Sequence, residues 1–278
     1  MLAAVRRVVR GAAAPGSAVP GSAVAVPVAI VLEVLALLSA AALAAALPSL
    51  DQVLSGYVAA RGGLGALNGT HTMRATGTMT LGSAAPVPFT LEVRRPDKIR
   101  LEYRAGGATV VRAYDGKRGF ALVSREGAPA EPKPMTPDEE RLAAEQADLA
   151  GPLILPKTKG NKVEWIGEQQ LDGRRTYALK VTPKGRTPRT IWLDAETLLN
   201  VQEEGTRRAG TTDVAYVTRT ADWRKVGEAG KPARIAVPFR VETGLKDGRD
   251  RQVFVFEKVE LDVKLPDARF APPAAPAR

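Results

Sequence analysis

Hydrophobic and polar residues follow two different periods along this chain. Between residues 49 and 61 the apolar side chains recur every three or four positions, which predicts a helix. Ser49 and Gln52 have the spacing of a capping box, and Gly62 and Gly63 form a typical helix end, because glycine adopts the left-handed conformation at little cost. From residue 70 onward the period changes to two, which predicts strands.

The alternating segments follow one another closely, and connections this short favour antiparallel pairing. Asp115 and Gly116 predict a tight hairpin turn, as do Asp172 and Gly173, because a type I′ turn needs positive φ at both central residues. So many strands must curl, and we expect a mainly β fold with some α: a single strongly curved antiparallel sheet, or half-barrel, with helices covering its concave apolar face. The predicted strands are Met73–Leu81, Val87–Arg95, Ile99–Tyr103, Thr109–Tyr114, Arg118–Val123, Val163–Gln169, Arg174–Val181, Thr190–Asp194, Leu199–Glu203, Thr212–Trp223, Ile235–Glu242 and Arg251–Val263.

A second helical pattern interrupts the strands at residues 136–151. Thr136 fits the N-cap, Pro137 the first helical position and Glu139 the third position of a capping box. The apolar side of this helix is narrow, and segments rich in proline and glycine flank it. A helix of this kind is either a movable lid over the sheet or a plug at one of its ends.

The first residues have the composition of a targeting segment. Arginines precede an apolar run that is long enough to span a bilayer, and Ala44 and Ala46 match the small-residue pattern of a cleavage site. We predict that residues 1–46 are a signal peptide or an N-terminal membrane anchor, that residues 47–273 form one exported domain, and that residues 274–278 are a disordered tail.

Composition and charge exclude several classes of function. The chain of 278 residues has no cysteine, which rules out disulfides and thiolate chemistry, and its one histidine, His71, is expected in a loop. The net charge of +10 is spread along the chain rather than gathered in a block, so no nucleic-acid partner is predicted. Acidic residues on the second helix are typical of a solvated helix surface. The sequence therefore predicts neither an enzyme, nor a metal site, nor a cofactor.

The stretch FTLEVRRPDKIRLEY, residues 89–103, carries the strongest candidate for a binding surface. Alternate side chains on a strand share a face, so the apolar residues here line one side of the sheet. We expect a ligand-binding apolar cavity lined by Phe89, Leu91, Val93, Ile99, Leu101, Tyr103 and Phe120.

Parity along the same strand separates two adjacent arginines. Arg94 alternates with Glu92 and is expected in water, whereas Arg95 alternates with Val93 and enters the rim of the apolar face. A guanidinium placed there needs acceptors, and backbone carbonyls at a helix end would serve. Alternatively, the strand twists outward before Arg95 and both arginines are solvated.

Several motifs in a fixed order resemble the LolA-type periplasmic lipoprotein carriers and the longer outer membrane lipoprotein-sorting proteins. The resemblance covers residues 48–273, and no single motif is specific. The segments that carry it are VRRPDKIRLEY, VVRAYDGKRGFAL, RFAPP, ARGGLGAL, ATGTMTL, ADLAGPLI, KGNKVEWIGEQQLDGRRTYALKV, IWLDAETLL, ADWRKV and VPFRVET.

The resemblance implies a half-barrel with a helical lid over a hydrophobic cavity and no cofactor. It implies a monomeric periplasmic carrier or chaperone that holds the acyl chains of a lipoprotein or lipid during transfer towards the outer membrane. An inner-membrane transporter and an outer-membrane acceptor would be its partners. The arginine before the proline ties the lid in such carriers, and Arg95 occupies that position here.

The chain also departs from the family pattern. The segment Gly205–Pro232 has no clear counterpart in classical carriers, and a phenylalanine near position 120 replaces the usual tryptophan. The same fold occurs in RseB-type regulators that sense mislocalised lipoproteins, and in at least one enzyme. An envelope sensor or interaction module therefore stays open as an alternative, and an enzyme on this scaffold is a more remote one.

Overall fold

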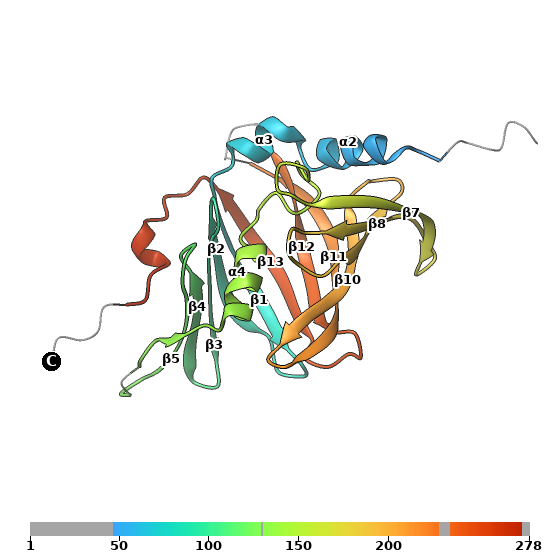
Figure 1. The fold of residues 1–278 in the computed structure, drawn as a ribbon. Coiled ribbons are helices and arrows are strands. Elements are labelled where there is room, and N and C mark those ends of the chain that lie inside the picture. Colours follow the sequence, from blue (N-terminus) through green and yellow to red (C-terminus); the bar gives the residue numbers. More distant parts are fainter. Residues whose placement is uncertain (1–46, 129, 228–233, 274–278) are drawn as a thin grey trace, which may run out of the picture. The chain divides into compact units, whose positions relative to one another are not determined.

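The computed structural model describes residues 47–128, 130–227 and 234–273. These residues belong almost entirely to one compact unit that begins at Pro48, and a single sheet of 13 strands dominates it (Figure 1). The strands are β1 Thr72–Leu81, β2 Val87–Arg94, β3 Lys98–Ala105, β4 Ala108–Tyr114, β5 Gly119–Arg125, β6 Lys133–Pro134, β7 Lys162–Leu171, β8 Arg174–Thr182, β9 Arg189–Asp194, β10 Asn200–Ala209, β11 Thr212–Val226, β12 Ile235–Leu245 and β13 Gln252–Leu261.

The sheet is antiparallel at every pairing, and its order is β6-β5-β4-β3-β2-β1-β13-β12-β11-β10-β9-β8-β7. Strands that follow each other in the sequence are neighbours in the sheet wherever a short turn joins them. The long-range pairing of β1 with β13 joins the two halves of this meander. The prediction of a mainly β fold built on one large antiparallel sheet is therefore confirmed.

Of the two predicted type I′ turns, only Asp172-Gly173 has the expected backbone conformation, because Asp115 is not among the residues with positive φ. Asp172 and Gly173 both have positive φ, at 50° and 75°, as a type I′ turn requires. At the other predicted turn, Gly116 has φ 95° and the Asp115 amide donates to the Arg118 carbonyl at 3.1 Å. These turns keep the register of their strands and so decide which side chains share a face.

Within the described residues, three α-helices accompany the sheet: α2 Leu50–Ala60, α3 Gly63–Gly69 and α4 Pro137–Gln146. The predicted capping boxes are present in α2, with Ser49 and Gln52, and in α4, with Thr136 and Glu139. Helix α3 was not predicted, because its sequence GLGALNG contains three glycines and has low helix propensity. Its buried Leu67, only 1% exposed, shows that tertiary packing stabilises it.

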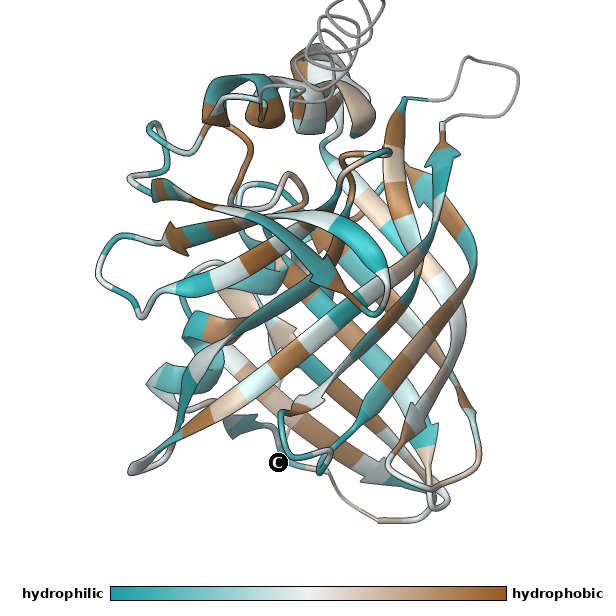
Figure 2. Ribbon diagram, turned by 90° about the vertical axis from the view of Figure 1, so that its right-hand side faces the viewer, coloured by the Kyte–Doolittle hydropathy of each residue, from teal (hydrophilic) through white to brown (hydrophobic). Residues whose placement is uncertain are grey.

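The sheet has two faces of different character, and Figure 2 shows hydrophobic and hydrophilic residues alternating along the strands. We call the side that carries Leu91 the inner face, because residues of all three α-helices join the main apolar core with strand residues of that side. That core contains Val53 and Tyr57 of α2, Leu67 of α3, Ala143 of α4, and the strand residues Val93, Leu179, Val181, Ile191 and Leu193, among others. The opposite side is the outer face.

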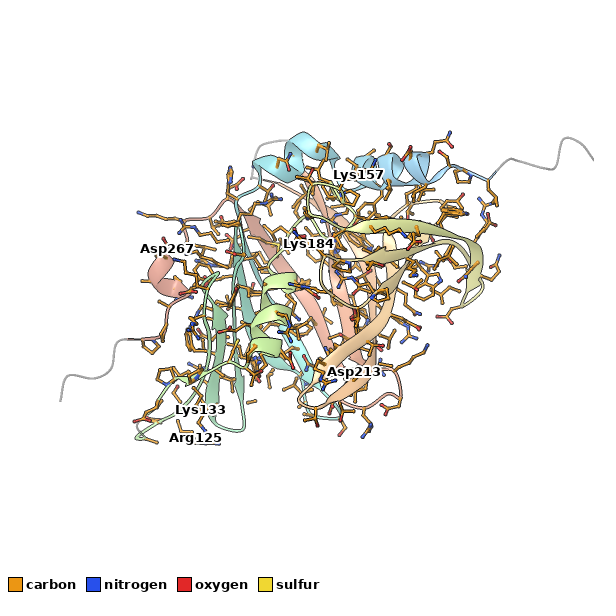
Figure 3. All side chains as sticks on the ribbon, viewed as in Figure 1. Arg125, Lys133, Lys157, Lys184, Asp213 and Asp267 are labelled. Carbon is orange, nitrogen blue, oxygen red and sulfur yellow. The ribbon has the colours of Figure 1, made fainter. Side chains whose placement is uncertain are left out.

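The end of the chain crosses the outer face as a short segment that we call the C-terminal strap, residues 264–270. Leu265 and Phe270 bury their side chains to 4% and 0% exposure, and the single turn η1, Asp267–Arg269, lies between them. Asp267 is labelled in Figure 3 beside this turn, well away from α4. The chain after the strap is described as far as residue 273.

Some predictions fall on residues outside the described ranges. The signal peptide or anchor at residues 1–46 and the tail at residues 274–278 stay predictions, as does the domain boundary between them. None of the helices in the described ranges is long and apolar enough to cross a membrane. Most of Gly205–Pro232 is described, and it belongs to strands β10 and β11 rather than to an added module.

Candidate functional site

Six of the seven predicted cavity residues lie on the inner face and oppose one another in pairs. Strand β2 pairs with β3 so that the opposed residues are Phe89 and Tyr103, Leu91 and Leu101, and Val93 and Ile99. The first and last pairs bury Phe89, Val93 and Ile99 to 3%, 1% and 8% exposure, while the other three side chains are partly exposed. The parity predicted for these strands is confirmed, and it produces a continuous apolar surface.

This surface continues across β1 onto the two last strands. Phe89 meets the rings of Phe254 and Phe256 edge-on, each at a centroid distance of 5.4 Å. Met79 and Phe239 are buried in the same cluster, and partly buried side chains surround it, namely Leu81, Val87, Leu91, Leu101, Tyr103, Val226, Val241, Phe254 and Val259. The inner face therefore presents partly exposed apolar side chains beside a buried aromatic cluster.

Phe120 does not belong to this surface. Directly opposed residues of neighbouring strands share a face. Phe120 opposes Ala113 of β4, Ala113 opposes Arg100 of β3, and Arg100 opposes Glu92 of β2, so all of them lie on the outer face. There it packs with Val111 and Ala113 in a separate small core. Parity within one strand does not carry across a turn, and for this reason the prediction that Phe120 lines the inner surface is wrong.

The two adjacent arginines point to opposite sides of the sheet. Arg95 donates from Nη2 to the Leu67 carbonyl near the end of α3 at 2.9 Å, while its Nε is buried without a hydrogen-bond partner in the described chain. Arg94 is only half exposed, contrary to expectation, and donates to the Leu265 carbonyl of the strap at 2.6 Å. Arg95 thus has the helix-end carbonyl expected of an inward arginine; its role as a lid latch stays a prediction.

A third arginine, which the sequence did not reveal, makes more contacts with the helical region. Arg61 ends α2, is 7% exposed, and donates to the Leu149 carbonyl at 3.0 Å and to the Ala150 carbonyl at 3.4 Å, in the connection after α4. Its Nε donates to the Ala236 carbonyl of β12 at 3.1 Å. One buried guanidinium therefore joins α2, the segment after α4 and the sheet.

Helix α4 is attached to both halves of the sheet by its acidic side chains. On one side, Glu139 accepts from Arg112 of β4 at 2.8 Å, and Glu140 accepts from the Gly119 amide of β5 at 2.8 Å. On the other side, Glu145 binds two arginines of the β8–β9 region. The prediction of a solvated acidic face is therefore wrong for these carboxylates, because partners distant in sequence reach them.

The pKa of Glu139 lies below its ordinary value. The Thr136 backbone amide donates to its carboxylate, and the Arg112 guanidinium adds a second hydrogen bond. Both interactions favour the ionised form, and they outweigh the opposing effect of partial burial. Glu139 is accordingly a carboxylate at neutral pH and ties the first turn of α4 to β4.

The outer face of the sheet carries two polar pockets. The first, of about 330 Å³, is lined by residues that include Lys180, Trp192 and Glu204, and the second, of about 280 Å³, by residues that include Glu204, Arg219 and Glu242. Neither includes any of the seven predicted cavity residues. Within the described residues, no three His, Asp or Glu side chains gather as a metal ion would require. His71 lies exposed in a loop, as predicted.

Solved structures similar to this chain are known. A DUF1329 family protein from Desulfovibrio piger is 14% identical with a TM-score of 0.51, over 80% of this chain and 96% of that chain. A putative outer membrane lipoprotein-sorting protein domain from Vibrio parahaemolyticus is 12% identical with a TM-score of 0.49, over 78% of this chain and 94% of that chain. A LolA superfamily protein from Nitrosomonas europaea is 13% identical with a TM-score of 0.47, over 81% and 98%.

These similarities concern the fold alone, because the sequences are so different. LolA-superfamily and lipoprotein-sorting structures are among those that this chain resembles, as its sequence motifs predicted. No protein-family model and no curated protein matches the sequence.

Proposed function

We propose that the unit beginning at Pro48 binds the acyl chains of a lipoprotein or lipid on its inner face. The observation that carries the proposal is the apolar surface formed by β1–β3, β12 and β13, where Leu91, Leu101 and Tyr103 remain partly exposed beside a buried aromatic cluster. Burying partly exposed apolar side chains against an acyl chain removes apolar area from water, which stabilises the complex by about 25 cal/mol per Å².

Helix α4 is proposed as the movable cover of this surface. Its buried contribution to the core is the small side chain of Ala143, and its attachments to the sheet are ion pairs and hydrogen bonds. Half-exposed ion pairs contribute little net stability because water can replace them. Displacing α4 therefore costs less than displacing a helix with a broad apolar side.

In this proposal the protein is a binding protein without catalytic activity or cofactor. It acts as a monomeric periplasmic carrier or chaperone, after export directed by residues 1–46, and passes acylated cargo towards the outer membrane. Exchange with an inner-membrane transporter and an outer-membrane acceptor would follow from that role. The fold and the sequence motifs support this assignment, and the inner apolar surface supplies its physical basis.

The test is native mass spectrometry of the full-length protein produced in a Gram-negative host. We expect copurifying lipid or acyl peptide, reduced several-fold by Leu101→Gln and unchanged by Glu102→Gln, since the neighbouring side chain points to the outer face. If no acyl ligand is captured from the host or after incubation with acylated peptide, the proposal fails.

A further inference from the structure

The inner face is not apolar throughout, and its polarity changes in a definite direction. Val241 of β12 lies beside the aromatic cluster and opposes Thr220 of β11. Thr243, the following residue of β12 on the inner face, opposes Thr218 of β11, and their hydroxyls are 2.8 Å apart. Thr218 opposes Glu203 of β10, which opposes Ile191 of β9. The same face that is aromatic at β13 therefore becomes polar at β11 and β10.

A cluster of charges lies at the end of this polar stripe. Arg189, two residues before Ile191 and on the same side, is 12% exposed and donates from Nη1 to Glu203 at 3.2 Å and to Glu145 of α4 at 3.1 Å. Arg186, in the β8–β9 loop, pairs with Glu145 as well. Tyr216 donates its hydroxyl to Glu203 at 2.7 Å. Lys184, labelled in Figure 3, marks this loop close to α4.

With α4 in the position that the structure shows, the positive and negative charges of this cluster balance. Two arginines, Arg186 and Arg189, face two carboxylates, and one of those carboxylates belongs to α4. Burial alone would lower the pKa of Arg189, but the carboxylates of Glu203 and Glu145 outweigh it and raise that pKa above its ordinary value. Arg189 Nε is buried and has no hydrogen-bond partner in the described residues, so the guanidinium retains an unused donor.

Movement of α4 would remove Glu145, so that Arg189 keeps Glu203 and Arg186, which is 31% exposed, loses the carboxylate with which it pairs. Two neighbouring guanidinium groups with only one carboxylate between them carry excess positive charge, so another anion at this position would stabilise the open state. Guanidinium groups bind phosphate and carboxylate oxygens with charge-assisted, often bidentate hydrogen bonds. Arg189 aligns through Gly205 and Tyr216 with Leu245 of β12. Three strand spacings and a four-residue offset along β12 therefore separate Arg189 from Val241, about 20 Å along the sheet. That separation suits a ligand with an apolar chain and an anionic end.

We infer that Arg186 and Arg189 form a subsite for the anionic headgroup of a lipid whose acyl chain lies on the apolar part of the inner face, and that Glu145 occupies this subsite when α4 is closed. The inference rests on the proposed function and adds the class of ligand. Glu145 acts as an internal substitute for the headgroup, so binding of the lipid and release of α4 are coupled. A ligand can shift this equilibrium only because it takes over contacts that the closed state makes.

The test compares three probes on the full-length protein: dioleoyl phosphatidylglycerol, dioleoylglycerol in the same neutral micelles, and inorganic phosphate. The variants are Glu145→Gln, the double variant Glu145→Gln with Arg186→Gln, and Arg240→Gln as a control on an exposed arginine that pairs with Glu242. Hydrogen exchange of the α4 amides reports on its release, and titration gives the two lipid affinities.

We expect about tenfold tighter binding of phosphatidylglycerol than of dioleoylglycerol by the natural protein and by Arg240→Gln. Glu145→Gln should bind phosphatidylglycerol several-fold more tightly still, and the double variant should lose the preference between the two lipids. Phosphatidylglycerol should increase exchange in α4, whereas inorganic phosphate at millimolar concentration should not.

The inference is overturned if the double variant keeps the tenfold preference, or if phosphate alone releases α4 as the lipid does. Equal binding of both lipids by the natural protein also overturns it but leaves acyl binding standing. Binding of neither lipid overturns the proposed function itself, so the two failures are distinguishable.

Discussion

The two faces of the sheet are held to the segments that pack on them by different kinds of contact. On the outer face, Glu92 is 1% exposed and accepts from Arg74 at 3.0 Å and from Arg269 of the C-terminal strap at 2.8 Å, with Arg100 at 3.9 Å. On the inner face, the helices and the segment after α4 are attached through backbone carbonyls and half-exposed carboxylates.

The two faces differ in how much it costs to remove the segment that packs on each of them. Removing the strap would take Arg269 away from a fully buried carboxylate, which is costly because only Arg74 and the more distant Arg100 would then compensate its charge. The inner contacts end on backbone carbonyls and on side chains near water, which can exchange partners at lower cost. This contrast is consistent with the proposal that α4 moves while the outer contacts stay in place.

The largest effect is expected from breaking the contacts of Glu92 on the outer face. Glu92→Ala leaves Arg74, Arg100 and Arg269 around an uncompensated buried site, and the free energy of unfolding should fall by about 3–5 kcal/mol. Urea denaturation measures the loss. The control is Glu102→Ala, which removes a 40% exposed carboxylate from Arg100 and should cost about 0.5 kcal/mol. Similar losses for both variants would contradict the contrast between the faces.

The next effect concerns the buried arginine of the inner side. Arg61→Met keeps the aliphatic stem but leaves the carbonyls of Leu149, Ala150 and Ala236 without its donors, which should cost about 2–4 kcal/mol in total. Hydrogen exchange should rise most in residues 147–154. Arg61→Lys retains the charge but not the planar fork, so an intermediate loss is expected. Unaltered exchange in that segment would show that Arg61 does not hold it.

The adjacent residues Arg94 and Arg95 allow one contact on each face of the sheet to be removed separately. Arg95→Leu removes the donor to Leu67 and should loosen α3, while Arg94→Leu removes the donor to Leu265 and should loosen the strap. Each loss is about 1.5 kcal/mol, because one charge-assisted hydrogen bond disappears. Exchange measured at residues 66–70 and 265–270 should change in only one segment for each variant. Identical exchange patterns would refute the assignment of these arginines to opposite faces.

The smallest effect is a pH-dependent one in α4. The folded state lowers the pKa of Glu139 below its ordinary value of 4.5, so its ionised form stabilises the fold above that value. This contribution is lost as the pH falls through the lowered pKa. Glu139→Gln should therefore cost about 0.5–1 kcal/mol at pH 7 and progressively less as the pH falls below the ordinary value of 4.5. Urea midpoints of both proteins across this range measure the difference, which should not stay constant.

Local signals in the sequence predicted much of this architecture. Capping boxes at Ser49 and Thr136, the Asp172-Gly173 turn and the alternation in β2 and β3 depend on residues close in the chain. Such interactions are visible without a tertiary structure, because helix caps, tight turns and strand parity are properties of short segments. Helix α3 escaped prediction since its glycines oppose the local helix preference that packing overrides.

The candidate site was less accessible from the sequence. The prediction of which residues share a face is confirmed within the β2–β3 hairpin and is wrong for Phe120, which lies two turns further along the meander. That these residues bind a ligand stays a prediction. Arg61 meets Ala236 across 175 positions, and Arg269 meets Glu92 across 177. Neither contact leaves a periodic signal, and acidic residues on α4 look solvated until their distant arginines are placed.

The sequence by itself therefore determined most of the strands, helices α2 and α4, the antiparallel character of the sheet, and the parity that turns Arg94 and Arg95 to different sides. Only the tertiary structure decided which charges are paired. It placed the strap arginine on Glu92 and the β8–β9 arginines on Glu145. The physical reason is that burial changes the energy of a charge by far more than any local propensity, and burial depends on segments that lie far apart in the chain.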